Sequence, residues 1–113
     1  MSDTCIFCRI VAGTIPATIV ASSDTAMAFR DLSPQAPVHV LVIPRRHTAS
    51  LADAVDAAEL GAVLALAAEV ARIEGVAESG YRVVTNAGPE GGQTVSHLHL
   101  HVLGGRQMHW PPG

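Results

Sequence analysis

The order of hydrophobic and polar residues predicts β-strands in five parts of the chain. The last of them, Ser96–Leu103, alternates from His97 to Val102, with histidine at positions 97, 99 and 101 and an apolar residue after each. Because successive side chains point to opposite faces of a strand, His97, His99 and His101 share one face, and leucine and valine occupy the other. The apolar face is predicted to be buried and the histidine face to be a functional site. The other four predicted strands are Ala17–Ser22, Ala26–Arg30, Val38–Pro44 and Tyr81–Thr85.

Two further segments have helical spacing. The spacing over Cys5–Gly13 predicts a short helix, and that over Asp53–Glu74 predicts a long one. Near the start of the long helix, Asp56 and Glu59 have the spacing of an N-terminal capping box. Gly75 follows its last residue and fits the C-terminal stop. The long helix carries an apolar stripe expected to face the core, formed by Leu60, Val63, Leu64, Ala67, Val70 and Ile73. These elements predict one α+β domain over residues 1–113, with an antiparallel sheet of about five strands, one long helix and one short helix.

One predicted strand, Val38–Pro44, is apolar and β-branched on both faces, which is typical of a central strand. Its histidine, His39, shares a face with Leu41 and Ile43. Such a histidine is either a core residue with satisfied hydrogen bonds or a fourth imidazole beside the histidine face. The sequence leaves both interpretations open.

Composition excludes several classes of function. The 113 residues carry a formal net charge of -3 with a pI near 6.0, which argues against a nucleic-acid polymer as the main ligand. No apolar run is long enough to span a bilayer, and the first residues lack the basic and apolar regions of a signal peptide. The default expectation is a cytoplasmic protein that contacts neither membrane nor nucleic acid.

Cys5 and Cys8 form a C-x-x-C pair at the start of the short predicted helix. Two thiolates at this spacing can hold zinc, but a structural zinc site needs four ligands, and His47 is a possible third. A redox pair is a weaker interpretation because no strand precedes the motif. A third interpretation is that the two cysteines are simply small apolar residues buried in the core.

The remaining candidates lie in loops. Asn86–Thr94 is rich in glycine and directly precedes the histidine strand, so it is either a flexible turn or a cradle of backbone N–H groups for a phosphate. Asp31 follows a predicted strand, where a carboxylate can bind ribose hydroxyls or simply form a turn. Together with the imidazoles, these features favour transfer at phosphorus by nucleophilic attack from a histidine, with no metal required for catalysis.

The motif His97–Leu103, H-x-H-x-H followed by two apolar residues, resembles the signature of the histidine triad (HIT) superfamily. The resemblance extends through Asp31–His39, Asn86, Gly91–Val95 and the tail Gly104–Gly113, which is similar to the histidine triad nucleotide-binding (Hint) branch in its bacterial form. It covers nearly the whole chain.

This resemblance implies a homodimer whose two sheets join into one, with a purine nucleotide at each site. It implies hydrolysis of P–N bonds, as in adenosine 5'-monophosphoramidate or AMP-lysine, through a nucleotidyl-histidine on His99. The implied catalytic residues are His99, His101, His39, His97 and Thr94. The implied nucleotide-binding residues are Phe7, Ile10, Phe29, Asp31, Leu32, Leu41, Asn86, Gly92, Gln93, Thr94, Val95, His99, His101 and Trp110, the last reaching the partner's site.

Three positions differ from the common pattern of the branch. Thr94 stands where serine is common, Ser96 replaces an aromatic residue, and Cys8 is absent from many animal members. Bacterial members have the cysteine pair, and their zinc site is similar to a structural site formed here by Cys5, Cys8, His47 and His97. Two alternatives to the phosphoramidase remain: a nucleotide-binding regulatory module with incidental slow hydrolysis, and a catalytic metal site made by the three triad histidines.

Overall fold

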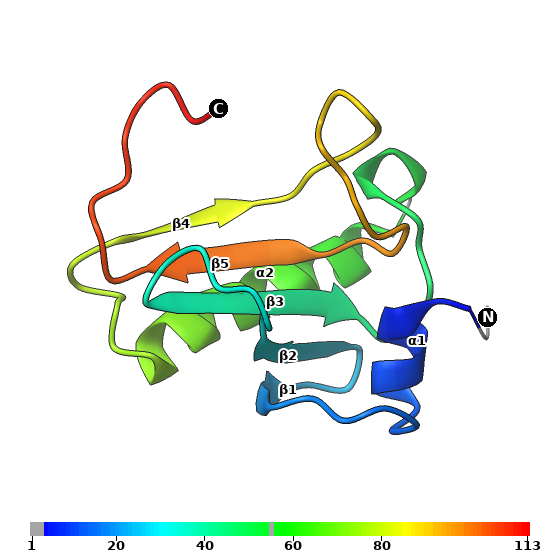
Figure 1. Ribbon diagram of the computed structural model, residues 1–113. Helices are drawn as coiled ribbons and strands as arrows, with labels where there is room; N and C mark the ends of the chain where they lie inside the picture. The colour runs from blue at the N-terminus through cyan, green and yellow to red at the C-terminus, as the bar shows by residue number, and fades with distance from the viewer. Residues whose placement is uncertain (1–3, 55) are drawn as a thin grey trace.

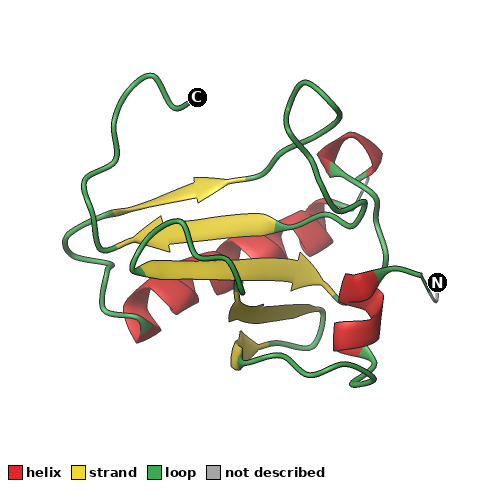
Figure 2. Ribbon diagram, viewed as in Figure 1, coloured by secondary structure: helices red, strands yellow, loops and turns green. Residues whose placement is uncertain are grey.

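The computed structural model describes residues 4–54 and 56–113. Its centre is an antiparallel sheet in the order β1-β2-β3-β5-β4. Figure 1 shows the long helix α2 across one face of this sheet and the short helix α1 beside the other face; Figure 2 shows the same layers by element type. The α+β prediction is confirmed. The elements are α1 (Ile6–Val11), β1 (Ile19–Ser22), β2 (Ala26–Arg30), β3 (Val38–Pro44), α2 (Ala57–Ile73), β4 (Tyr81–Val84) and β5 (Leu100–Gly104).

Alternation along β2 and β3 divides the core into two clusters. One lies under α2 and includes Ala26, Ala28, Val40, Val42, Leu98, Leu100 and Val102. The other lies on the α1 side and consists of Phe7, Ile10, Met27, Phe29, Leu41 and Ile43. Since β3 is buried on both faces and pairs with β2 and β5, the prediction of a central strand is confirmed.

Helix α2 begins later than predicted. Asp56 is its N-cap, and the side chain accepts hydrogen bonds from the backbone N–H groups of Ala58 and Glu59. Leu51–Asp53 instead forms a short 3₁₀ turn capped by Ser50. The predicted start at Asp53 is therefore wrong, while residue 55 of that predicted span lies outside the described residues.

The buried stripe of α2 is also rotated from the predicted one. Leu64 and Ile73 are 56% and 50% exposed, whereas Leu66 and Ala71 are buried. The helix is apolar around most of its circumference, so spacing alone did not select the face that packs on the sheet. No helix among the described residues is long and apolar enough to cross a membrane.

The histidine strand is shorter than predicted. Pairing with β3 ends at Val42 opposite Leu100, and pairing with β4 ends at Val84 opposite His101. Before this point the chain bends away, and the N–H of Leu98 bonds to the carbonyl of Thr48 at 2.6 Å. A strand needs a partner at each position, so the start at Ser96 is wrong. The alternation of side chains nevertheless continues through this bend.

Candidate active site

The histidine segment lies between the two halves of the core. Its leucine and valine side chains pack in the cluster under α2, as the alternation predicted. The rings of His97 and His99 lie on the other side, where both pack against the Phe7 ring in T-shaped arrangements, with centroids at 5.8 and 5.2 Å. Helix α1, which carries Phe7, is therefore the wall against which these imidazoles are held.

The orientation of His99 identifies its reactive nitrogen. Nδ1 lies 2.7 Å from the carbonyl oxygen of His97. A carbonyl only accepts hydrogen bonds, so Nδ1 carries the proton and Nε2 of the neutral ring keeps its lone pair. The hydroxyl of Thr85 donates to the carbonyl oxygen of His99 at 2.8 Å and holds the backbone there. Sequence reasoning did not identify Thr85, although its place at the end of a predicted strand was the available signal.

His39 joins the triad rather than serving only as a core residue. Its Nε2 lies 2.8 Å from Nδ1 of His101, and its Nδ1 accepts the backbone N–H of Gln35 at 2.9 Å. Burial lowers the pKa of His39, and the nearby Asp31 carboxylate opposes this shift. Burial, followed by the charges of His99 and His39, lowers the pKa of His101 to about 4, against the opposing effect of Asp31. Both rings are therefore neutral at pH 7.

Asp31 forms a turn contact, and its second carboxylate oxygen lies beside His39. Its Oδ1 accepts the backbone N–H of Ser33 at 2.7 Å, which is a turn contact, and its Oδ2 lies 3.4 Å from Nε2 of His39. Asp31, His39 and His101 are close enough to hold a metal ion. However, Nδ1 of His39 accepts a hydrogen bond, so Nε2 carries the proton and its lone pair is not available to a metal. This cluster is better described as a hydrogen-bonded polar wall.

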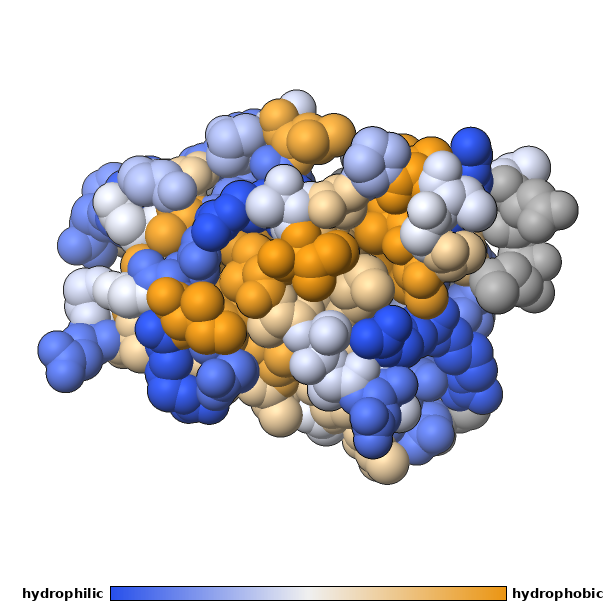
Figure 3. Space-filling model, turned by 90° about the horizontal axis from the view of Figure 1, so that it is seen from below, coloured by the Kyte–Doolittle hydropathy of each residue, from blue (hydrophilic) through white to orange (hydrophobic). Residues whose placement is uncertain are grey.

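A cavity of about 230 Å³ opens beside these polar groups. Figure 3, which views the molecule from below, shows hydrophobic side chains gathered across this side of the molecule, where α1 and β1 lie. Ten of the predicted nucleotide-binding residues line the cavity: Phe7, Ile10, Phe29, Asp31, Leu32, Leu41, Thr94, Val95, His99 and His101. Ile6, Pro16, Ala17 and Arg30 also line it and were missed, because no motif marks them.

Four predicted binding residues do not line this cavity: Asn86, Gly92, Gln93 and Trp110. The side chain of Gln93 stabilises the glycine-rich loop instead, since Nε2 donates to the carbonyls of Ala49 and Val95. Trp110 is 82% exposed on the C-terminal tail.

The glycine-rich loop is folded on itself. The N–H groups of Gly88, Gly92 and Gln93 donate to Gln93 Oε1, Pro89 O and Gly88 O, respectively. These three N–H groups therefore already have acceptors within the loop and are not available to a phosphate. Only N–H groups at the end of the loop remain for the predicted phosphate cradle. Gly91 must be a glycine, because a Cβ there would lie 2.4 Å from the carbonyl oxygen of Ala87.

The second cluster of ligand atoms is formed by Cys5, Cys8, His47 and His97, whose donor atoms lie within 4.8 Å of one another. Sγ of Cys5 lies 3.3 Å from Nδ1 of His97, and Sγ of Cys8 lies 3.3 Å from Nδ1 of His47. Nε2 of His97 donates to the carbonyl of Pro44 at 2.9 Å, which leaves the lone pair on Nδ1 directed at the thiols. Two thiols and two imidazoles in this arrangement fit a tetrahedral zinc ion.

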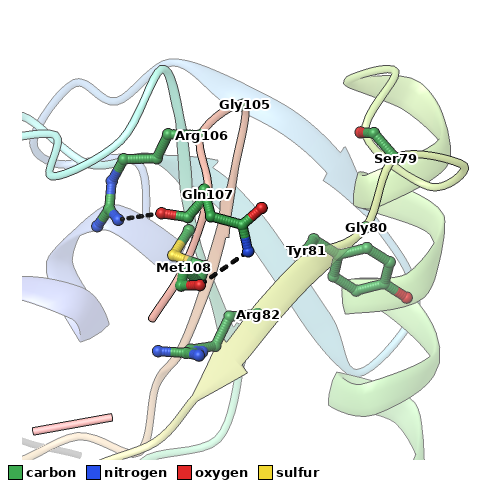
Figure 4. A pocket seen from close by; sticks show the side chains of 8 residues that line it. All are labelled: Ser79, Gly80, Tyr81, Arg82, Gly105, Arg106, Gln107 and Met108. Atoms are coloured by element: carbon green, nitrogen blue, oxygen red, sulfur yellow. Dashed lines mark hydrogen bonds between the residues drawn. The ribbon is translucent and has the colours of Figure 1, made fainter. Parts of the chain in front are cut away.

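Another cavity, of about 580 Å³, lies between the start of β4 and the tail (Figure 4). Its charged residues are Arg82 and Arg106, and both guanidinium groups already bind backbone carbonyls. The triad does not line it. The smaller cavity beside His99 is therefore the candidate active site.

The comparison with known proteins agrees with this arrangement. Residues 12–108 match the HIT domain family. The chain belongs to the HIT family. It is 52% identical over 115 residues to an uncharacterized HIT-like protein of Synechococcus elongatus, with both chains covered in full. It is also 47% identical over 112 residues to adenylylsulfatase HINT1 of Arabidopsis thaliana, covering 96% of this chain and 76% of that protein.

Solved structures of HIT family members have the same fold. A HIT family hydrolase from Legionella pneumophila superposes with a TM-score of 0.94 at 50% identity, covering 97% of this chain and 100% of that chain. A HIT family hydrolase from Clostridium thermocellum gives a TM-score of 0.93 at 41% identity, covering 96% of each chain. The family and fold expected from the histidine motif are thus confirmed.

Proposed function

We propose that this HIT protein is a nucleotide hydrolase that cleaves the P–N bond of purine nucleoside phosphoramidates, such as adenosine 5'-monophosphoramidate and AMP-lysine. The observation that carries the proposal is the lone pair on Nε2 of His99 at the wall of an apolar cavity that also contains Asp31 and His101. The similarity to HIT family hydrolases and to HINT1 supports hydrolysis of a nucleotide.

The nucleoside occupies the apolar cavity. Phe7, Phe29 and Leu41 surround the base, and the Asp31 carboxylate accepts hydrogen bonds from the ribose hydroxyls. This orientation directs the α-phosphate toward His99 and His101, with Thr94 beside the leaving group. The hydroxyl of Thr94 performs the role for which serine is common in the Hint branch.

The reaction has two steps. Nε2 of His99 attacks phosphorus, the P–N bond breaks, and the leaving nitrogen takes a proton from water and departs as the amine. The hydroxide left by that water then attacks the phosphorus of the nucleotidyl-histidine, the P–Nε2 bond breaks, and AMP leaves as the electron pair returns to Nε2. The half-buried imidazole of His101 stabilises the charge that develops on the phosphoryl oxygens.

Zinc has a structural role in this proposal. Cys5, Cys8, His47 and His97 hold the ion, which supplies a cross-link between the start of α1 and the histidine segment. No step of the hydrolysis passes through it. Metal-binding thiols also fit a reducing compartment, so we assign the protein to the cytoplasm.

The active form in this proposal is a homodimer. Strand β4 forms an edge of the sheet, and Tyr81 and Val83 on it are each 38% exposed. Pairing of two such edges extends the sheet and directs the exposed Trp110 toward the partner's site. Mixing His99→Ala with Trp110→Ala tests this. In a mixed dimer, the Trp110→Ala protomer supplies His99 and the His99→Ala protomer supplies Trp110 to the same site. One site is therefore intact, and the activity of the mixture should rise above that of either variant alone. No gain in activity would contradict the dimer.

Single-turnover mass spectrometry with adenosine 5'-monophosphoramidate tests the chemistry. The wild type should show a transient added mass of one adenylyl group, and His99→Ala should bind AMP but form no adduct. Adenylyl sulfate is the comparison substrate, because it carries the same adenylyl group on a different leaving group. Tight AMP binding with no adduct and no turnover would instead favour a nucleotide-binding regulatory module.

A further inference from the structure

The C-terminal tail is bound to the loop that follows β2. Nε of Arg106 donates to the carbonyl oxygen of Gln35 at 3.1 Å. The preceding residue, Gly105, has φ of +88°, and a Cβ there would lie 2.9 Å from Cβ of Pro37 in the same loop. Only a glycine allows this approach. Figure 4 shows the guanidinium of Arg106 extended away from the cavity, with a second hydrogen bond to the carbonyl of Gln107.

The same loop also reaches His39 through the backbone of Gln35. The backbone N–H of Gln35 donates to Nδ1 of His39 at 2.9 Å. A backbone N–H can only donate, so Nδ1 of the neutral His39 ring has the lone pair and Nε2 has the proton. Nε2 lies 2.8 Å from Nδ1 of His101 and donates to it. Nδ1 of His101 therefore has a lone pair, and its proton is on Nε2.

We propose that the backbone amide of Gln35, anchored by Arg106, is a positioning group that sets the tautomers of His39 and His101 so that His101 presents an N–H to the phosphoryl oxygens. This inference rests on the proposed function, since it concerns how that site binds its phosphate. The role of Arg106 is indirect, because its guanidinium reaches the loop carbonyl and not the cavity beside His99.

The chemistry requires this tautomer. With the opposite one, the lone pair on Nε2 of His101 would face negative phosphoryl oxygens and repel them. A protonated His39 or His101 would also provide an N–H donor, but burial lowers the pKa of both rings, so they are not protonated at neutral pH. The groups facing His101 are His39, His99 and the Asp31 carboxylate, and the carboxylate does not reverse the shift.

Long-range proton–nitrogen NMR on the labelled imidazoles tests the tautomers directly. At pH 7 the wild type should show His39 and His101 protonated on Nε2. Gln35→Pro removes the donor N–H, whereas the matched control Gln35→Ala keeps it. We expect the first variant to populate the Nδ1–H form of His101 and the second to resemble the wild type. Nδ1–H in the wild type, or equal behaviour of the two variants, would overturn the proposal.

Arg106→Met tests the anchor without a proline in the loop, so the proposal stays falsifiable if Gln35→Pro does not fold. We expect a mixture of His101 tautomers and a loss of kcat on the order of 10- to 100-fold with little change in KM. Arg82→Met is the matched control, because Arg82 binds the tail carbonyl of His109 and not the loop. A wild-type tautomer pattern in Arg106→Met would reject the anchor.

The two proposals can fail separately. If the wild type forms no nucleotidyl adduct but its tautomers respond as expected, the phosphoramidase is rejected and the positioning of His101 is supported. If the adduct forms and the tautomers do not respond, the hydrolase stands and the role of Gln35 and Arg106 is rejected.

Discussion

Sγ of Cys5 lies 3.3 Å from Nδ1 of His97, although 92 positions separate the two residues in the chain. The same His97 accepts, through its carbonyl oxygen, the Nδ1–H of His99 at 2.7 Å. One residue therefore connects the thiol cluster at the start of α1 with the proposed nucleophile. This connection makes the metal centre testable by stability as well as by chemistry.

Replacement of Cys8 by serine should abolish stoichiometric zinc binding. Cys8 is 2% exposed and supplies one of four ligand atoms, and serine is a poor ligand for zinc in this geometry. We expect about one zinc per chain in the wild type by elemental analysis, much less in Cys8→Ser, and a lower melting temperature for the variant.

A chelator is the control for this prediction. It should lower the melting temperature of the wild type toward that of Cys8→Ser and leave the variant nearly unchanged. Equal zinc content in both proteins would contradict the four-ligand site.

Mild acid should destabilise the folded chain. The pKa values of His39 and His101 are lowered in the folded state, that of His101 to about 4, so the unfolded chain binds more protons between pH 6.5 and about 4. The stabilisation is complete above pH 6.5 and is lost progressively as the pH falls through this window. Urea midpoints should be lower at pH 5.0 than at pH 7.5, and His101→Gln should reduce the difference. Identical midpoints at the two pH values would argue against neutral buried rings.

Leu32 offers a way to separate binding from folding. It lines the candidate site yet is 98% exposed, so Leu32→Ser should change the free energy of unfolding by no more than about 0.5 kcal/mol. Loss of its proposed contact with the nucleoside should weaken AMP binding by up to about tenfold in calorimetry.

Ile19→Ser is the matched control for Leu32→Ser. Ile19 is an exposed apolar residue, 47% accessible, that does not line the cavity, so its replacement should not alter AMP affinity. An equal loss of affinity in the two variants would indicate a general effect of surface hydrophobicity.

Two neighbouring residues of α2 test which helix face is buried. Val63 is 1% exposed and Leu64 is 56% exposed. Val63→Ala removes two buried methyl groups and should cost about 2 kcal/mol, whereas Leu64→Ala should cost well under about 1 kcal/mol despite removing more atoms. Urea unfolding of both variants measures the contrast. Large losses of stability in both variants would support the face first predicted from the stripe, which includes Val63 and Leu64.

The sequence alone determined the features that depend on local geometry. Alternation over His97–Leu103 separated the histidines from the residues that pack in the core, because a strand-like chain directs successive side chains to opposite sides even where no strand partner is present. The apolar, β-branched composition of Val38–Pro44 predicted a central strand, and Asp56 caps a helix through its own side chain.

Only the tertiary structure decided what depends on distant parts of the chain. Spacing showed that α2 is apolar on several sides, but contact with the sheet selected Leu66 over Leu64. Four candidate ligand residues were recognisable, but folding brought Cys5 to His97. Above all, the chemistry of each imidazole depends on which nitrogen carries the proton. That is decided by backbone partners such as the carbonyl of His97 and the amide of Gln35. These groups give no signal in a residue pattern, because every residue has a carbonyl and every residue except proline has an amide N–H.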